Sequence, residues 1–247
     1  MTADGPGSGS GSGSGSRRGA PAVPGRRALL RGVLLGGTTV LTGFRTTGCS
    51  PSSPRGTNPS ARTDRPASAA ERGKRVLLAY FSRPGENYHY GVRTDLQVGN
   101  TEVLARMISE RMECDVHRFD AAVPYPDSYD DAVARNAREQ EADARPAIAN
   151  LPSSIDRYDT VLLGGPIWNV RAPMIMSTFA EKFDCRGKTV FPFTTYAMSG
   201  LGTTERDYAA SCPGATVGEG LAVRGEKVRE ADADVRSWLR RIGARQD

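Results

Sequence analysis

The sequence has few of the side chains that build metal centres and catalytic triads. It contains only two histidines and four cysteines in 247 residues, and their spacing matches no metal-binding pattern. Long apolar runs are missing as well. The most apolar stretch near the N-terminus, residues 33–44, is too short to span roughly 30 Å of hydrocarbon, and Arg31 interrupts any extension. These absences argue against a resident metal, a histidine-activated nucleophile and a membrane-spanning helix.

Positive charge is concentrated at the N-terminus. The chain carries 33 Lys and Arg against 28 Asp and Glu. Residues 1–72 hold 10 basic and 3 acidic side chains, so residues 73–247 hold 23 and 25 and carry a net charge of −2. Because nucleic-acid-binding domains present a basic surface, this C-terminal region lacks the charge for that function. It is long enough to form one domain with a hydrophobic core.

The N-terminal segment has the composition of a leader. Residues 1–16 are a Gly/Ser-rich segment with too few apolar residues to offset the entropy of ordering. Arg26 and Arg27 precede a weakly hydrophobic, glycine-containing stretch, which resembles a twin-arginine export signal. The alternative is a basic patch before a membrane anchor. Residues 46–49 resemble a lipoprotein cleavage box with Cys49 as the lipidated residue, although Thr46 stands where that pattern has Leu.

These observations divide the chain into three parts. Residues 1–48 are expected to be a disordered leader with the export signal, and residues 49–73 are a linker rich in Pro, Ser and Arg. Residues 74–245 are the predicted folded domain. We therefore expect an exported, extracytoplasmic protein that contacts the membrane only through its leader or through a lipid on Cys49.

Strand and helix patterns alternate through the predicted domain. Short runs of strand-forming residues predict strands at 76–81, 114–121, 160–165, 188–196 and 215–223. Apolar residues at helical spacing and polar, charged runs predict helices at 101–112, 128–144, 174–183, 204–211 and 228–243. Pro192 counts against the fourth strand, because proline removes a ladder hydrogen bond. Five strands alternating with helices predict an α/β fold, a three-layer doubly wound sheet of parallel strands.

The carboxyl ends of three predicted strands are rich in glycine, hydroxyl and aromatic residues. Ligands of such sheets bind beyond these ends, at the point where the strand order reverses. The segments concerned are residues 81–83, 164–170 and 194–202. None places a nucleophile beside a base, and Ser82 has no plausible partner to activate it. The pattern therefore predicts a binding site with no catalytic residues and no metal.

An ordered series of short motifs runs through the same region. The series is YFSR, GNTEV, PYPDSYDDA, NAREQ, ARPAI, YDTVLLGGPIW, APM, GKTVFPF, SGLG and a late WL. Together these motifs resemble the flavodoxin-like family, specifically its longer bacterial branch, over about residues 74–243. The resemblance implies the strand order 2-1-3-4-5 and a noncovalently bound FMN. It places the phosphate on the loop after the first strand and the isoalloxazine between the loops after the third and fourth strands.

The resemblance also implies which residues bind FMN. Trp168 is the first candidate to stack on the ring, since an indole offers a flat apolar face, and Tyr196 would stack opposite. The alternative is that Trp168 belongs to the core. The glycines after the fourth strand would let backbone amides approach the pyrimidine. The full predicted set is Ser82, Arg83, Asn100, Thr101, Pro166, Ile167, Trp168, Asn169, Thr195, Tyr196, Ser199, Gly200 and Gly202.

Residues 84–98 form an unusually long connection between the first strand and its helix. Such connections usually need only a few residues. Here the segment separates Ser82 from Gly99-Asn100-Thr101, which look like the two halves of the phosphate site. We expect the segment to loop out and cover the phosphate and ribityl chain, with Tyr88, His89 and Tyr90 as its candidate contacts. The alternative is a solvent-exposed insertion that touches nothing.

Two functions are consistent with the sequence. The first is an FMN electron carrier or flavin-dependent reductase, with an unknown redox donor and acceptor such as a quinone or a nicotinamide-linked partner. Twin-arginine export carries folded proteins, which suits a cofactor inserted before export. The second is a non-enzymatic binding module that has lost FMN. The presence of Ser82, Thr101 and Trp168 favours the first.

Two cysteines are candidates for a disulfide. Cys185 and Cys212 each lie about three residues before a predicted strand, the fourth and the fifth. In the implied order these strands are parallel neighbours about 5 Å apart, so both residues fall at the same edge of the sheet. A pair of this kind can close in an oxidising compartment. The alternative is two ordinary free thiols.

Overall fold

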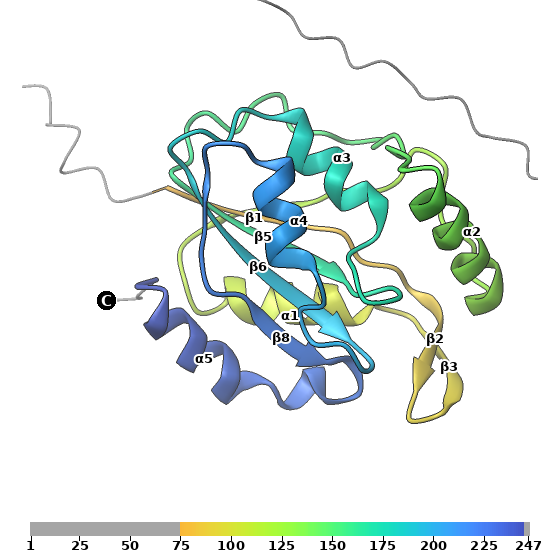
Figure 1. The fold of residues 1–247 in the computed structure, drawn as a ribbon. Helices are drawn as coiled ribbons and strands as arrows, with labels where there is room; N and C mark the ends of the chain where they lie inside the picture. The colour runs from red at the N-terminus through yellow and green to blue at the C-terminus, as the bar shows by residue number, and fades with distance from the viewer. Residues whose placement is uncertain (1–74, 245–247) are drawn as a thin grey trace, which may run out of the picture. The chain divides into compact units, whose positions relative to one another are not determined.

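The structure, a computed structural model, describes residues 75–244 (Figure 1). One sheet contains β1 (Val76–Tyr80), β4 (Asp115–Arg118), β5 (Thr160–Pro166), β6 (Thr189–Tyr196), β7 (Thr216–Val217) and β8 (Leu221–Arg224), and all its pairings are parallel. The helices are α1 (Asn100–Ser109), α2 (Tyr129–Glu141), α3 (Met174–Lys182), α4 (Thr204–Ser211), the 3₁₀ helix η1 (Gly225–Glu230) and α5 (Asp232–Arg241). The predicted α/β class is confirmed.

The sheet is buried on both faces by helices. Leu77, Ala79 and Leu163 point to one face and join the core formed with α3 and α4. Leu78 and Leu162 point to the other face and pack with residues of α1 and α5. Figure 1 shows these two pairs of helices on opposite sides of the strands. Unbroken apolar runs in β1 and β5 follow from this double burial, because neither face of a central strand meets water.

The strand order agrees with the expected 2-1-3-4-5 for the first four strands, while the fifth strand is divided. The order is β4-β1-β5-β6-β7, and β8 also pairs with β6. β7 pairs with Thr189 and Val190, and β8 pairs with residues from Phe193 onward. Pro192 falls between these two pairings, so its missing N–H faces the interruption and costs no ladder hydrogen bond. The prediction of one continuous strand at 215–223 was therefore wrong, because two separate strands occupy this part of the chain.

The long connection after β1 is a β-hairpin. Strands β2 (Gly85–His89) and β3 (Val92–Leu96) pair antiparallel. Tyr90 and Gly91 join them, with φ of 47° and 90°, which is the backbone of a two-residue type I′ turn. The hairpin contacts the segment before α2, where the Glu86 amide donates to the Asp127 carbonyl at 2.9 Å. The alternative of an insertion that contacts nothing is therefore excluded. The segment that was expected to loop out forms regular secondary structure instead.

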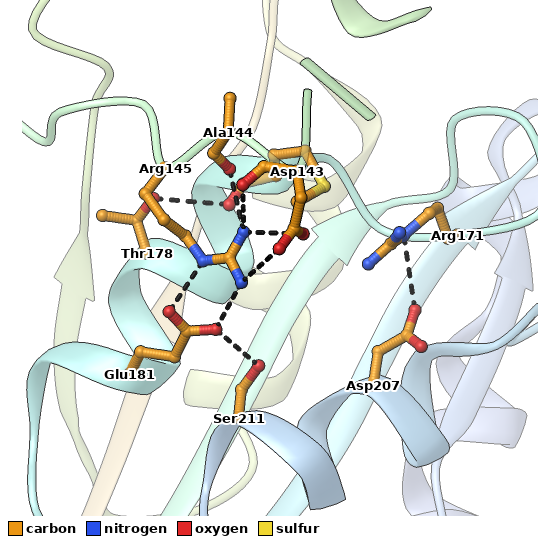
Figure 2. Close-up of polar contacts among 9 residues, drawn as sticks. Asp143, Ala144, Arg145, Arg171, Thr178, Glu181, Asp207 and Ser211 are labelled. Carbon is orange, nitrogen blue, oxygen red and sulfur yellow. Dashed lines mark hydrogen bonds and ion pairs between the residues drawn. The ribbon is translucent and has the colours of Figure 1, made fainter. Parts of the chain in front are cut away.

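An arginine clamp fastens the loop after α2 to α3 and α4 (Figure 2). Arg145 donates to both carboxylate oxygens of Glu181, at 2.7 and 2.8 Å, and also to Asp143. Ser211 at the end of α4 donates to Glu181 at 3.4 Å. Hydrogen bonds from Arg145 lower the pKa of Glu181, so this stabilisation is present near neutral pH and is lost as the pH falls through that lowered value. The clamp fixes the chain that leaves α2.

Arg145→Ala is expected to lower the free energy of unfolding by about 1 kcal/mol. A bidentate arginine–carboxylate pair is stronger than a single ion pair, but the partial exposure of both side chains limits its contribution. Urea denaturation at pH 7 measures the loss. Arg186→Ala is the matched control, because Arg186 pairs only with Asp184 two residues away and is more exposed. An equal loss in both variants would show that the clamp adds nothing beyond a surface ion pair.

Several sequence predictions concern residues before 75. The export signal at Arg26 and Arg27, the lipidation of Cys49 and the linker at 49–73 lie outside the described residues. Within residues 75–244, the structure contains no helix long and apolar enough to cross a membrane. The first strand of the described residues, β1, begins at Val76.

Candidate functional site

A pocket of about 580 Å³ opens at the carboxyl ends of β1, β5 and β6. Its walls bring together residues from loops that are more than a hundred positions apart in the chain. Most of the predicted site residues line it, namely Ser82, Arg83, Asn100, Thr101, Pro166, Ile167, Trp168, Asn169, Thr195, Tyr196 and Ser199. The predicted Gly200 and Gly202 are not among its lining residues. The volume suits a ligand of small cofactor size.

One end of the pocket is built around the N-terminus of α1. Gly99 is the N-cap of this helix, and a side chain there would meet the Ser82 Oγ at 2.4 Å and the Arg83 carbonyl at 2.5 Å. Only glycine therefore lets the β1 loop approach the helix start. The Glu102 amide donates to the Ser82 Oγ at 3.1 Å, which orients this hydroxyl and leaves its own proton to donate. The first N–H groups of a helix have no partner within it and favour an anion.

A second buried hydroxyl pair lies at the same end. Thr101 Oγ1 and Thr195 Oγ1 are 2.7 Å apart and form a hydrogen bond. Thr101 is 2% exposed and Thr195 is 5% exposed. When one hydroxyl donates to the other, the second still has a proton to donate. The pair therefore joins α1 to the end of β6 and offers one further donor to a ligand.

Arg83 adds a buried positive charge to the pocket wall. Its guanidinium donates to the carbonyls of Pro126, Asp127 and Glu86, and its Nε is buried without a hydrogen-bond partner among the described residues. Burial lowers the pKa of Arg83. Its hydrogen bonds go to backbone carbonyls, and the charges of Asp127 and Glu86 act against the effect of burial on its pKa. An anionic ligand nearby would add to this compensation of the buried cation.

Trp168 forms the aromatic part of the pocket. It follows β5, and its ring packs edge-on against Tyr125 at 5.0 Å and against Phe81 at 6.0 Å between centroids. The side chain is half-buried, so it both joins the core and lines the pocket. The core interpretation and the ligand interpretation are therefore compatible. The surrounding rings fix the orientation of the indole that the pocket presents.

A strained turn holds Trp168 in place. Asn169 and Val170 have φ of 52° and 62°, and the Trp168 amide donates to the Arg171 carbonyl at 2.8 Å. Positive φ is unfavourable for a β-branched residue, so other contacts must fix the turn. The Thr203 amide donates to the Val170 carbonyl at 2.9 Å, and a side chain at Gly202 would lie 2.1 Å from that carbonyl oxygen. Gly202 thus permits contact between two loops, where the prediction expected contact with a cofactor.

The sequence prediction missed the wall formed by α2. Tyr129, Ala132, Val133, Asn136 and Ala137 of this helix line the pocket. Only Ala132 and Asn136 of α2 are buried, so the helix lacks the apolar face from which packing is inferred. Ala197 and Met198 line the pocket within the predicted segment 194–202, whereas Gly225 and Glu226 line it without having been predicted. Their proximity follows from the divided fifth strand and the turn into η1, which no local pattern indicated.

The β2–β3 hairpin spans the side of the pocket between α2 and η1. Asn87 and Tyr88 line the pocket, whereas His89 and Tyr90 do not. On one side the Tyr129 amide donates to Glu86 at 3.0 Å, and Arg93 lies 3.6 Å from the centre of the Tyr129 ring. On the other side the Tyr90 amide donates to Glu226 at 3.2 Å. The hairpin is therefore attached at both ends, as a cover over the pocket requires.

The pocket presents binding groups rather than a nucleophile with its base. Ser82 contacts a backbone amide, and Thr101 contacts another hydroxyl. Hydroxyl donors, a helix N-terminus and a buried arginine fit a phosphate group, and the indole fits a flat ring system. The donor set and the volume are thus those of a site for a phosphorylated aromatic ligand.

The strand order and this pocket define a flavodoxin-like α/β protein. The chain belongs to the flavodoxin family, which residues 92–242 match. It is similar to the crystal structure of a proposed flavoprotein from Bacteroides eggerthii DSM 20697, with 28% identity and a TM-score of 0.57 over 69% of this chain and 99% of that one. A proposed flavoprotein from Bacteroides uniformis ATCC 8492 has 28% identity and a TM-score of 0.54 over 68% and 99%. No curated protein sequence matches the chain.

Proposed function

We propose that this protein binds FMN noncovalently and acts in electron transfer or flavin-dependent reduction outside the cytoplasm. The observation that carries the proposal is the set of buried hydroxyls at the N-terminus of α1, continuous with a pocket that contains Trp168. Ser82 and Thr101 would donate to the phosphate, and Trp168 would stack on the ring. The flavin supplies the redox chemistry when bound. The protein residues bind it, orient it and exclude water from it.

The redox partner and the compartment belong to the same proposal. Export of the folded protein is supported by the paired Arg26 and Arg27, and membrane attachment by Cys49. The near-neutral charge of residues 73–247 does not favour a strongly charged protein partner. A small acceptor such as a quinone, or a nicotinamide-linked donor, fits this charge better. Val133 and Met198, which are exposed at the pocket, offer apolar contact to such a molecule.

Identification of the bound flavin tests the proposal. Full-length protein purified from cells is expected to be yellow, and heating should release FMN, identified by chromatography against riboflavin and FAD. The apoprotein should bind FMN with a stoichiometry of one by titration calorimetry. A folded preparation that neither contains nor binds FMN would overturn the proposal and favour a binding module without flavin. For protein that does bind FMN, reduction by NADH or NADPH and oxidation by a soluble quinone would identify the classes of electron donor and acceptor.

Trp168→Ala is expected to lower FMN affinity about tenfold and to raise the fluorescence of the bound flavin. Stacking contributes about 0.5–1.5 kcal/mol beyond area burial, and 1.4 kcal/mol corresponds to a factor of ten. Fluorescence titration measures both effects. Trp238→Phe is the control, because Trp238 of α5 is fully buried in the core and donates to the Glu219 carbonyl. A loaded Trp168→Ala variant with unchanged flavin emission would place the indole away from the ring.

A further inference from the structure

Cys185 and Cys212 occupy the same position in two stacked turns. In each turn the amide three residues later donates to the cysteine carbonyl, at 3.0 Å for Lys188 and 3.1 Å for Ala215. Each turn has a glycine with positive φ two residues after the cysteine, as type II turns require. The Gly187 amide in turn donates to the Gly214 carbonyl at 3.0 Å. The two turns are therefore bonded to each other in register.

The strands that follow the turns keep this register. Thr189 of β6 pairs with Thr216 of β7, and each threonine lies four residues after its cysteine. Parallel neighbours in a sheet are about 5 Å apart. A disulfide requires Cα atoms about 4.4–6.8 Å apart. The register thus places the two cysteines opposite each other at a separation that suits a disulfide.

The two thiols already contact each other. Both are buried, with Cys185 5% exposed and Cys212 1% exposed. Both sulfurs lie near the Ala180 carbonyl oxygen, at 3.9 and 3.8 Å, and each thiol shifts the pKa of the other. In the structure both cysteines are free thiols. The shared Ala180 carbonyl and the strand register bring the two sulfurs into the same buried site.

The two thiols differ in their access to solvent and in their acidity. Cys185 lies on a surface groove of about 630 Å³ between the ends of α3 and α4, whereas Cys212 is not among the residues that line it. The hydrogen bond with Cys212 and the charge of Lys188 lower the pKa of Cys185 despite its burial. The same hydrogen bond and burial raise the pKa of Cys212. Cys185 is therefore the thiol that an oxidant in the groove meets first.

We propose that Cys185 and Cys212 form a reversible disulfide when the protein meets a small-molecule disulfide such as oxidised glutathione. The Cys185 thiolate, having lost its proton to solvent, attacks one sulfur of the oxidant and releases one thiolate. Cys212 then loses its proton, attacks the Cys185 sulfur of the mixed disulfide and releases the second thiolate. The protein loses two electrons and two protons, and the oxidant is reduced to two thiols.

The closed ring contains residues that serve the pocket. Residues 185–212 include β6, the loop that carries Met198 and Ser199, and the helix α4. The bond would lie at the opposite end of β6 from the pocket, so it constrains the unfolded chain without entering the binding site. For a ring of this length the chain-entropy model and the usual dependence of Tm on stability give a rise in Tm of about 6–12 °C.

Peptide mapping of the full-length protein tests the proposal. The protein carries Cys49→Ser and Cys114→Ser, so that only the pair remains, and is incubated with oxidised glutathione. Mass spectrometry without reduction should show the loss of two hydrogen atoms and a linked Cys185–Cys212 peptide, and dithiothreitol should reverse both. Two free thiols, or stable attachment of glutathione to either cysteine, would overturn the proposal.

Thermal unfolding supplies an independent measurement with its own controls. The oxidised form should melt about 6–12 °C above the reduced form. Cys185→Ser and Cys212→Ser, made separately in the same background, should show no oxidant-dependent change in Tm. If either variant fails to fold, peptide mapping of the unsubstituted pair still decides the question. None of these readouts depends on flavin binding, so they remain valid if the proposed function is wrong.

Discussion

Replacing Ser82 with Ala and Thr101 with Val in one protein is expected to weaken FMN binding by two or more orders of magnitude. Hydrogen bonds to a charged group contribute about 1.5–3 kcal/mol each, and each 1.4 kcal/mol corresponds to a factor of ten. Both hydroxyls are buried beside the N-terminus of α1. Ser82 accepts from the Glu102 amide and keeps its proton, and Thr101 shares one free proton with Thr195. Fluorescence titration of apoprotein with FMN measures the loss. Riboflavin, which lacks the phosphate, should bind the variant and the parent almost equally.

The matched control for this variant is Ser109→Ala combined with Thr178→Val. It removes the same two groups from positions outside the pocket, since Ser109 and Thr178 donate to helix carbonyls of α1 and α3. Its FMN affinity should equal that of the parent. The near-ultraviolet circular dichroism of the pocket variant should match the parent, which confirms its fold. If the folded pocket variant binds FMN as tightly as the parent, the phosphate does not bind at Ser82 and Thr101.

The parts of the fold that the sequence predicted are those fixed by burial. β1 and β5 are apolar throughout because helices cover both faces of the sheet. α1 and α5 present apolar residues at helical spacing, among them Leu104, Ile108 and Val235, and these are fully buried. Local periodicity encodes such contacts directly. The fold class was therefore accessible from periodicity, whereas the strand order came from the resemblance to the flavodoxin-like family and holds for the first four strands.

The parts that were missed depend on contacts between distant segments. The β2–β3 hairpin contains Glu86, Arg93 and Asp95 and has no apolar alternation, because it is held by hydrogen bonds and by Arg93 over Tyr129. The fifth strand is divided at the level of Pro192 in its neighbour β6. Tyr129 lies outside the hairpin that it contacts, and Pro192 lies outside the fifth strand. Sequence periodicity reports the burial of a segment and carries no information about its polar partners.

The residues of the candidate site also fall into a predicted group and a missed group. Ser82, Trp168 and Thr195 were predicted because strand ends in a parallel sheet converge on one edge, and Thr101 was predicted from the family resemblance. Tyr129 and Asn136 were not, because α2 lies over the pocket rather than within the sheet layers and is polar on most of its surface. Its position follows from contacts with the hairpin and from the Arg145 clamp, both of which are properties of the folded chain.

Gly202→Ala is expected to lower the free energy of unfolding by about 2–5 kcal/mol and to weaken FMN binding. Gly202 has φ of 55°, where a side chain costs about 1–2 kcal/mol. The new methyl group would also lie 2.1 Å from the Val170 carbonyl oxygen, and backbone must move to admit it, at about 1–3 kcal/mol. That movement separates the loop after β5, which carries Trp168, from the loop after β6. Urea denaturation measures the stability, and fluorescence titration measures the affinity.

Gly200→Ala separates the cost of the left-handed backbone from the cost of the steric contact with Val170. Gly200 lies in the same loop with φ of 58°, but a side chain there would meet nothing within 4 Å. This variant should lose only about 1–2 kcal/mol of stability, the cost of the left-handed backbone, and should keep its affinity for FMN. The difference between the two variants is therefore the cost of parting the loops. If both lose the same stability and the same affinity, contact between Gly202 and Val170 does not hold the pocket together, and backbone conformation alone explains the glycines of this loop.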